Sequence, residues 1–574
     1  MTEEALEVTR IEREFSHCRI TPFCKVRPPE EIMLPMRDGV LLRTVVYRPD
    51  RDEAVPTIVV RTCYPKNDLV YRATALQYVQ RGFAYLYQYC RGTGGSQGIW
   101  EPNVNERSDG KDTIDWVCAQ SWVKNAGYFG CSYLALTGWA IADVLPEKVK
   151  TMYLTHYGTY RHVSAYKDGL FRHDILTGWT MENAGYPISA DYLDSCRYRP
   201  QLTVDEDVWG KRIDWYRDYL TNTDSDSPYW HQGVWKMLME VPKKLKVPIY
   251  LGEAWYDHHL GSAIASWRSI PPEVKKYSTF LIGAWDHDFH MRLEDKETKN
   301  AQNNDVLRAF EWFYERLEEE RLPKGEVRLY LTGADIWLSL PEFPAEQAEH
   351  AKLYLGSPTV GESHTLREKP QADAAQAVFV YDPENPVFSH GAESLLYTKE
   401  GIGSLRQPLP GSRNDVLTCI SEPVLQDMDI VGQIKLHLSV ATDAEDSAFT
   451  FKIMEMTPSG ESYHIRTGIT TLAYRNQSKH RMPYTPGETV PLVIDSWEVA
   501  YRIQQGSRIR VDITSSDFPQ YAIHSNYAGG WAEQKQSKPA HQSIFFGGEC
   551  PSYLEIPLLS TEKPSRSSLE QDGM

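Results

Sequence analysis

One serine of the chain lies where a strand is expected to turn directly into a helix. Ser132 stands between a glycine-bounded apolar stretch and a run of good helix formers, within residues 127–138. Such a bend strains the backbone and exposes the side chain at its tip, so the neighbouring residues must be small. Gly130 meets this demand, whereas the usual G-x-S-x-G pattern would place a second glycine at Leu134, next to the small Ala135. By itself, the stretch is equally consistent with a nucleophile and with an ordinary serine cap of a helix.

The segments around this serine alternate between buried strands and helices. A strand followed by a helix and another strand implies a parallel sheet with right-handed crossovers. The Asp38-Gly39 turn lies between two apolar-rich runs and predicts a β-hairpin over residues 31–48. We expect further strands at residues 57–60, 84–89, 149–154, 247–252 and 279–283, and helices at residues 67–80, 109–120, 305–320 and from the serine to about residue 144.

Other segments predict what surrounds this sheet. Residues 158–243 are helical in texture and rich in aromatic residues, which is typical of a cap over a pocket, although aromatic stripes can also be plain core. From residue 326, short alternating strands separated by turn residues predict an all-β sandwich or jelly roll that extends to residue 560. The expected division is an N-terminal extension at residues 1–28, an α/β domain in two parts at residues 29–157 and 244–325, and a disordered tail at residues 561–574.

The composition excludes several classes of partner. A formal net charge of −17 over 574 residues, with no local basic stripe, argues against nucleic acid and anionic lipid. No apolar run approaches the ~20 residues that a membrane span needs. The acidic N-terminus lacks the order of a secretory signal, so we expect a soluble, cytoplasmic protein. The nine cysteines show no C-x-x-C spacing and predict reduced thiols rather than disulfides or a zinc site.

Polar clusters that follow two later strands supply what a nucleophilic serine needs. Asp257 follows one predicted strand and His287 follows the next. The carboxyl ends of parallel strands share one edge of a sheet, so both residues should lie near Ser132. A serine hydroxyl needs a base, and the base needs an orienting acid; the order Ser, Asp, His is that of the α/β-hydrolase fold. His290 is a rival for the base, and the N–H of Tyr133 would meet the oxyanion.

Two other patterns could suggest a cofactor. Residues 91–98 are glycine-rich like a dinucleotide-binding loop, but the residues that follow do not open a helix. Residues 286–290 hold imidazoles and carboxylates, but they lie on one short loop without a helix that would preorganise metal ligands. We therefore expect neither a cofactor nor a metal ion.

Several motifs, in order along the chain, resemble the X-Pro dipeptidyl-peptidase and cocaine-esterase-like hydrolases, a family that includes α-amino ester hydrolases and β-lactam acylases. The resemblance extends from about residue 31 to residue 558. The matching motifs are residues 36–39, 61–64, 91–98, 109–113, 130–134, 255–257 and 283–287, followed by residues 486–488, 506–510 and 515–519 in the C-terminal part.

The resemblance implies an α/β-hydrolase domain with an inserted helical cap and a C-terminal all-β jelly roll. It also implies a serine hydrolase that acts through an acyl-enzyme. In this chain the nucleophile would be Ser132, the base His287 and the acid Asp257. The phenol of Tyr64 would donate to the oxyanion beside the N–H of Tyr133, where most such enzymes use two backbone donors.

The substrate that we expect is a small ester or amide, or a short peptide. A homodimer is possible, and the oligomeric state stays open. The main rival among enzymes is an X-Pro dipeptidyl-peptidase, which must recognise a free amine and a proline. A rival of another class is a carbohydrate-binding or scaffold protein with a degenerate hydrolase domain. Relatives that bind an α-amino group use a cluster of carboxylates, for which Asp168, Asp174, Glu182 and Glu253 are candidates by location. The acyl and leaving groups stay open.

Overall fold

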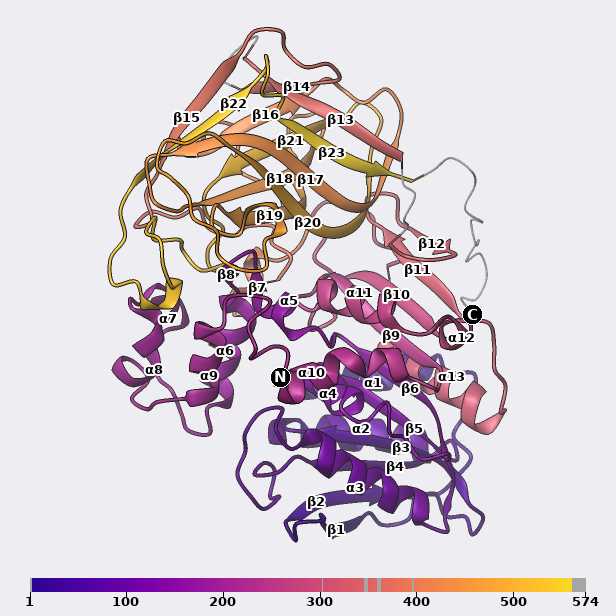
Figure 1. The fold of residues 1–574 in the computed structure, drawn as a ribbon. Helices are drawn as coiled ribbons and strands as arrows, with labels where there is room; N and C mark the ends of the chain where they lie inside the picture. Colours follow the sequence, from indigo (N-terminus) through magenta and orange to yellow (C-terminus); the bar gives the residue numbers. More distant parts are fainter. Residues whose placement is uncertain (1–2, 302, 345–348, 359–362, 395–396, 560–574) are drawn as a thin grey trace.

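The computed structural model describes residues 3–301, 303–344, 349–358, 363–394 and 397–559. The predicted tail at residues 561–574 lies outside these ranges. Figure 1 shows an α/β part, coloured indigo to magenta, packed against a β-rich part, coloured orange to yellow. The predicted fold class, an α/β domain followed by an all-β domain, is confirmed.

A ten-stranded mixed sheet forms the centre of the α/β part within the described ranges. Its inner strands are parallel: β3 pairs with β4 and β5, β5 with β6, β6 with β9, and β9 with β10. The predicted hairpin is the antiparallel pair β1–β2. In sheet order the strands are β1 (Glu30–Pro35), β2 (Leu41–Tyr47), β4 (Ala84–Tyr89), β3 (Val55–Thr62), β5 (Val123–Cys131), β6 (Val149–Thr155), β9 (Ile249–Tyr256), β10 (Thr279–Asp286), β11 (Glu326–Leu331) and β12 (Ile336–Leu340).

Burial on both faces explains why these strands are continuous apolar runs. All residues of β3, β4, β9 and β10 are buried. The flanking helices are α1 (Glu3–Ser16), α2 (Asp68–Val79), α3 (Glu106–Ala119), α4 (Tyr133–Trp139), α11 (Leu260–Ser269), α12 (Pro272–Lys275) and α13 (Asp305–Phe313), which continues as a π-helix η4 (Tyr314–Glu318). None of the helices in the described ranges is long and apolar enough to cross a membrane.

Two of the predicted elements need correction. Helix α4 ends at Trp139, not near residue 144. Residues 135–142 are all buried, so the chain stays buried on every side beyond the last residue of the helix. No alternation of polar and apolar residues therefore marks the end of the helix in the sequence. Strand β11 was expected to begin the β-rich part, but it pairs in parallel with β10 and extends the first sheet. A short alternating strand looks the same in sequence at the edge of either sheet. The division of the chain into domains stays a prediction.

Short helices occupy the segment between β6 and β9, where the sequence predicts a cap. Figure 1 shows α6 to α9 grouped on one flank, below the β-rich part. The elements of this segment are α5 (Arg161–Ala165), the small hairpin β7 (Tyr166–Lys167) and β8 (Leu170–Phe171), α6 (His173–Asn183), α7 (Tyr192–Arg197), η2 (Gln201–Thr203), α8 (Val204–Asp207), α9 (Asp214–Thr221), α10 (Gly233–Glu240) and η3 (Pro242–Lys244).

The β-rich part is one sheet that closes on itself. Because β17 pairs with both β20 and β23, nine of its described strands form a barrel-like ring, and β22 and β15 extend from β17. In chain order the strands are β13 (Glu349–Gly356), β14 (His364–Arg367), β15 (Ala375–Tyr381), β16 (Leu417–Ser421), β17 (Met428–Thr442), β18 (Ala448–Met456), β19 (Ser462–Thr471), β20 (Val490–Ile503), β21 (Arg508–Thr514), β22 (Ala540–Phe546) and β23 (Tyr553–Leu558).

The N-terminal helix α1 is integrated into the α/β part. The ring of Phe15 packs edge-on against Phe310 of α13, at 5.5 Å between centroids. The buried carboxylate of Glu14 accepts hydrogen bonds from the N–H groups of Val306 and Leu307, at 3.0 and 3.1 Å. These are the first-turn donors of α13, which have no partner within their own helix. Helix α1 therefore caps α13.

We expect Glu14→Ala to lower the free energy of unfolding by about 2 kcal/mol, because two buried N–H groups lose their acceptor. Burial raises the pKa of Glu14. Glu14→Gln keeps an acceptor oxygen for these two N–H groups and should therefore lose less. Urea unfolding measures both. The control is Glu7→Ala, which removes a partly exposed partner of Arg10 and should change stability by less than ~0.5 kcal/mol. Equal losses for all three variants would contradict the capping role.

Candidate active site

The strand-to-helix bend at Ser132 has the geometry that the sequence predicts. Ser132 joins β5 to α4 with φ 57° and ψ −126°, a left-handed conformation that is rare for residues other than glycine. A Cβ atom on Gly130 would lie 2.3 Å from the carbonyl oxygen of Leu134 and 2.7 Å from the nitrogen of Ala135. Only glycine fits at position 130, because the helix turns back over this residue.

The three residues that the sequence places in order are in mutual contact. Nε2 of His287 lies 2.9 Å from Oγ of Ser132, and Nδ1 of His287 lies 2.5 Å from Oδ2 of Asp257. Asp257 is fully buried, and its other oxygen accepts from the N–H of His259 at 2.6 Å. A carboxylate that binds Nδ1–H leaves Nε2 as the acceptor for the serine hydroxyl. The geometry thus joins Ser132, His287 and Asp257 in one hydrogen-bonded series with Nδ1 of His287 as the donor to Asp257.

Burial and neighbouring charges set the pKa values of His287 and Asp257. Burial by itself would lower the pKa of His287, but the charge and hydrogen bond of Asp257 raise it above the ordinary value of 6.5. Burial by itself would raise the pKa of Asp257, but His287 and its neighbouring imidazoles hold it well below its usual range. Asp257 therefore stays ionised, and His287 becomes a base as the pH rises through its elevated pKa.

The other histidines of these loops are placed differently. His290, the rival for the base, is half exposed, and its Nδ1 lies 3.6 Å from Oδ1 of Asp286. His258 is buried, its ring stacks on His287 at 4.3 Å, and its Nδ1 lies 3.1 Å from Oγ of Ser394, which belongs to the β-rich part. Nδ1 of His259 lies 3.0 Å from a serine hydroxyl of α5. The geometry thus selects His287 as the partner of Ser132.

Tyr64 lies where a second donor to an oxyanion is expected. It follows β3, and its hydroxyl oxygen accepts from the indole N–H of Trp179, on α6, at 3.1 Å. Burial raises the pKa of Tyr64 well above its ordinary value, and its contacts with Trp179 and Ser132 oppose this rise. The phenol is therefore neutral, and because the indole already donates to its oxygen, its O–H is free to donate elsewhere.

The backbone N–H of Tyr133 is the first of helix α4, among the donors that a helix leaves unused. The Tyr133 side chain is fixed: its hydroxyl accepts from the N–H of Asn103 at 2.7 Å and donates to Glu106 at 3.1 Å. Glu106 in turn forms a buried ion pair with Arg61, at 2.8 Å. This network anchors the start of α4 beside β3.

The glycine-rich loop at residues 91–98 is tied to two other segments of the chain by ion pairs. Arg91 forms ion pairs with Asp38 and Asp109, both at 2.7 Å. Three of the motifs that the sequence analysis singled out are thus joined by one guanidinium group. The loop contains no helix, as expected.

Three of the four candidates for an amine-binding cluster of carboxylates have separate partners, and the fourth is buried in a strand. Asp168 pairs with Lys167 at 3.6 Å, and Asp174 pairs with Arg172 at 3.2 Å. Glu182 accepts from Tyr397 at 3.0 Å. Glu253 is buried in β9, and one of its oxygens has no hydrogen-bond partner among the described residues. Burial, together with the charge of Asp257, raises the pKa of Glu253 well above its ordinary value.

Within the described ranges, one group of ligand atoms lies close enough to hold a metal ion. His156, Asp257 and His287 offer atoms within 4.8 Å of one another. These atoms are already used in hydrogen bonds among the same residues. We assign them no metal ion.

Three residues that take part in these contacts are not predicted from the sequence. His156 and Trp179 come from segments where an aromatic or a histidine is usually plain core, and Ser394 comes from the β-rich part. The only sequence signal for His156 is its position directly after β6, at the same sheet edge as Ser132. Trp179 lies in the aromatic-rich segment that predicts a cap, although nothing in the sequence singles it out within that segment. For Ser394 we find no local signal.

Comparisons with known proteins match most of the chain to one family. A family model described as X-Pro dipeptidyl-peptidase (S15 family) matches residues 38–288, and a model described as the X-Pro dipeptidyl-peptidase C-terminal non-catalytic domain matches residues 320–555. Cocaine esterase from Rhodococcus sp. (strain MB1 Bresler) is 27% identical over 570 residues, which cover 92% of this chain and 98% of that protein.

Solved structures support the fold over nearly the whole chain. An aminopeptidase from a marine sediment archaeon (Thaumarchaeota archaeon) has a TM-score of 0.77 and 22% identity, covering 93% of this chain and 96% of that one. An α-amino acid ester hydrolase has the same TM-score of 0.77 and 22% identity, with 94% and 98% covered.

We expect Gly130→Ala to destabilise the chain by about 2–3 kcal/mol, because its methyl group would overlap main-chain atoms that cannot rotate away. The shifted helix should also separate Ser132 from His287. The urea unfolding midpoint measures the first effect, and the rate at which a fluorophosphonate labels Ser132 measures the second. The control is Gly530→Ala, where φ is −65° and the nearest atom belongs to the flexible Glu533 side chain. A stable Gly130→Ala protein with unchanged labelling would contradict the steric argument.

Proposed function

Since the chain belongs to the X-Pro dipeptidyl-peptidase (S15) family of serine hydrolases, we propose that it cleaves an ester or amide bond of a small acyl substrate through an acyl-enzyme. The observation that carries the proposal is the continuous hydrogen-bonded series from Ser132 through His287 to Asp257. A serine hydroxyl attacks too slowly on its own, and this arrangement supplies its base and the acid that orients the base.

The proposed reaction proceeds in two halves. His287 takes the hydroxyl proton of Ser132 as Oγ attacks the substrate carbonyl carbon, and the tetrahedral intermediate then expels the alcohol or amine, which His287 protonates. In the second half, His287 takes a proton from water, and the resulting hydroxide attacks the acyl-enzyme. Ser132 leaves with the proton held by His287, and the acid is released. In each half, the oxyanion accepts from the N–H of Tyr133 and the phenol of Tyr64.

For the acyl group we favour a neutral, apolar or aromatic substituent. The rings of Tyr133 and Trp179 stack at 5.9 Å beside Ser132, and Trp215 packs edge-on against Trp179, also at 5.9 Å. Asp168, Asp174 and Glu182 each have a separate partner, and Glu253 is buried in β9, so we infer no common site for an α-amino group among them. An ester of a short aromatic acid suits this environment better than a peptide with a free N-terminus.

The experiment that tests the proposal is labelling by a fluorophosphonate together with turnover of p-nitrophenyl esters. Wild-type protein should be labelled at Ser132 and should hydrolyse the esters, and Ser132→Ala should lose both activities. The matched control is Ser278→Ala, which alters a buried serine at the opposite ends of the strands and should keep both. Full turnover by Ser132→Ala would refute the proposal.

The rival activity is that of an X-Pro dipeptidyl-peptidase, suggested by the description of the family model. Comparing Ala-Pro-p-nitroanilide with short aromatic acyl esters separates the two. We expect kcat/KM to favour the esters. A preference for the dipeptide anilide would replace our substrate assignment and leave the role of Ser132 intact.

We expect Tyr64→Phe to lower kcat about 100- to 1000-fold with little change in KM, since the phenol would donate only to the oxyanion that forms after attack. Steady-state kinetics on a p-nitrophenyl ester measure this split. The control is Tyr78→Phe, which removes a buried hydroxyl that has no partner among the described residues. A Tyr64→Phe variant whose kcat matches that of Tyr78→Phe would exclude Tyr64 from the oxyanion site.

A further inference from the structure

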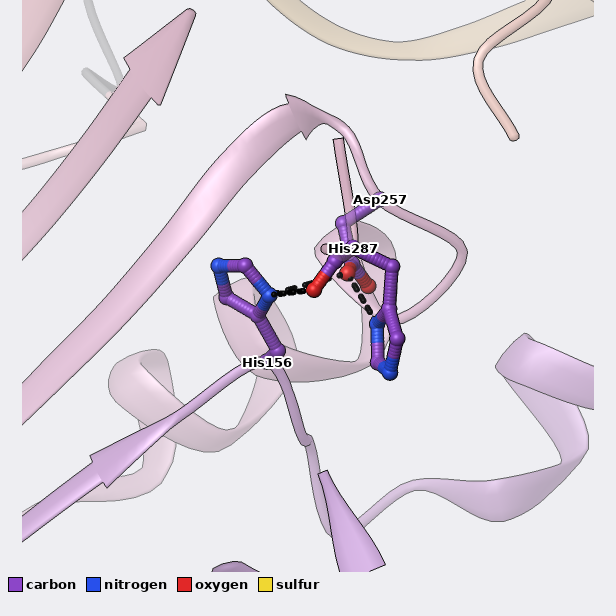
Figure 2. A group of neighbouring side chains, drawn as sticks. All are labelled: His156, Asp257 and His287. Atoms are coloured by element: carbon purple, nitrogen blue, oxygen red, sulfur yellow. Dashed lines mark hydrogen bonds and ion pairs between the residues drawn. The ribbon is translucent and has the colours of Figure 1, made fainter. Parts of the chain in front are cut away.

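A buried histidine beside Ser132, His287 and Asp257 has no part in the reaction described above. His156 directly follows β6, the strand between β5 and β9, and its side chain is fully buried. Its Nδ1 lies 2.9 Å from the carbonyl oxygen of His287 and 3.5 Å from Oδ2 of Asp257. Figure 2 shows this nitrogen directed at the carbonyl oxygen, with Asp257 just behind it.

The two ring nitrogens of His156 have different partners, and these define its tautomer. A carbonyl oxygen only accepts, so Nδ1 must carry the proton and donate to His287. The indole N–H of Trp285 points at Nε2 from 3.3 Å, so Nε2 must accept. The ring is neutral in this arrangement. Burial lowers the pKa of His156, which favours the same neutral form, although the charge of Asp257 opposes the shift.

His156 also packs against the loop that carries His287. The His156 ring stacks on the ring of Phe289, two residues after His287, at 4.2 Å between centroids. The guanidinium of Arg10, on helix α1, lies 5.8 Å from the centre of the same Phe289 ring. Phe289 adopts a left-handed φ of 64°. The short turn from His287 to Phe289 is thus held at its first carbonyl group by a hydrogen bond and at its end by a stacked ring.

We propose that His156 is a positioning residue, which fixes the main chain of His287 through the Nδ1–H···O=C hydrogen bond and thereby sets the reach of the His287 ring to Asp257 and Ser132. This role rests on the proposed function of His287 as the base. The positioning role requires a neutral His156, because a second proton, on Nε2, would point at the N–H of Trp285 and leave that N–H without its acceptor. The second proton would also place a positive charge 3.5 Å from the carboxylate that orients His287.

Several other groups face the two rings, and the test must separate their effects from that of His156. The titratable groups that act on His287 or His156 come from the ends of β9 and β10, the loop after β9, and α13; they are Asp257, His258, His259, Asp286, Asp288 and Asp305. All of these are unchanged in variants at position 156. A difference between two such variants therefore reports on the hydrogen bond itself.

The experiment compares His156→Leu with His156→Asn. The Asn amide can place an N–H donor close to the position of Nδ1, whereas Leu cannot donate. We expect Leu to lower kcat about 100-fold at constant KM, because a displaced base no longer matches the reacting geometry. Asn should keep kcat near that of wild type. The acid limb of kcat/KM should move to lower pH in His156→Leu, because the pKa of His287 falls as its contact with Asp257 loosens.

The control applies the same two substitutions to His464, a fully buried histidine of β19 whose Nε2 lies 3.0 Å from a threonine hydroxyl. There, Leu and Asn should differ in stability but not in kcat or in the acid limb. Equal losses of kcat for Leu and Asn at position 156, or an acid limb that stays fixed in His156→Leu, would overturn the proposal.

A measurement on the wild-type protein decides the matter if His156→Leu fails to fold. ¹⁵N NMR of histidine side chains, with the His156 signals assigned by their loss in His156→Asn, reports which ring nitrogen carries the proton. We expect a neutral ring protonated at Nδ1 throughout the active pH range. A ring protonated at Nε2 would overturn the proposal. This measurement does not depend on enzymatic activity. A wild-type protein without activity would therefore refute the proposed function and leave the assignment of the His156 tautomer to be decided by NMR.

Discussion

The parallel alignment of four neighbouring strands is the constraint on which the candidate site depends. Strands β5, β6, β9 and β10 lie next to one another and run in the same direction, so they end at one edge of the sheet. The residue directly after each strand is polar: Ser132, His156, Asp257 and His287, respectively. Adjacent strands lie ≈ 4.8 Å apart, so β5 and β10, with two strands between them, are about 14 Å apart. The contact between Ser132 and His287 therefore depends on the turns that follow these strands as well as on the shared edge.

The β-rich part completes the surroundings of this edge. Ser394 meets the buried His258, and Arg466 donates to the main-chain oxygen of Trp255, at 2.6 Å, just before Asp257. Tyr397 donates to Glu182 on helix α6. Buried polar groups need partners, since a group without one costs ~1–3 kcal/mol. The β-rich part supplies some of these partners to the loops that follow the sheet, and its packing is therefore coupled to the geometry of the site.

Much of this arrangement could be predicted from the sequence, because its pieces are local. Glycine at position 130 and the helix formers after Ser132 indicate the bend, and the apolar runs before Asp257 and His287 indicate buried strands. Prediction failed where burial removes periodicity, as at the end of α4, or where a strand could join either sheet, as with β11. The sequence left His290 as a rival of His287, since two histidines three residues apart on one loop are equivalent until the loop adopts a conformation.

By itself, the sequence determined the class of fold, the family, and the order in which a serine, an aspartate and a histidine follow strands of one sheet. Only the tertiary structure decided which histidine meets the serine, that Trp179 of α6 donates to Tyr64, and that Nδ1 of His156 lies 2.9 Å from the carbonyl oxygen of His287. The physical reason is the range of the interactions. Strands, helices and tight turns follow from neighbouring residues, whereas the partners of these polar groups lie more than a hundred residues away in the chain and depend on how the whole chain packs.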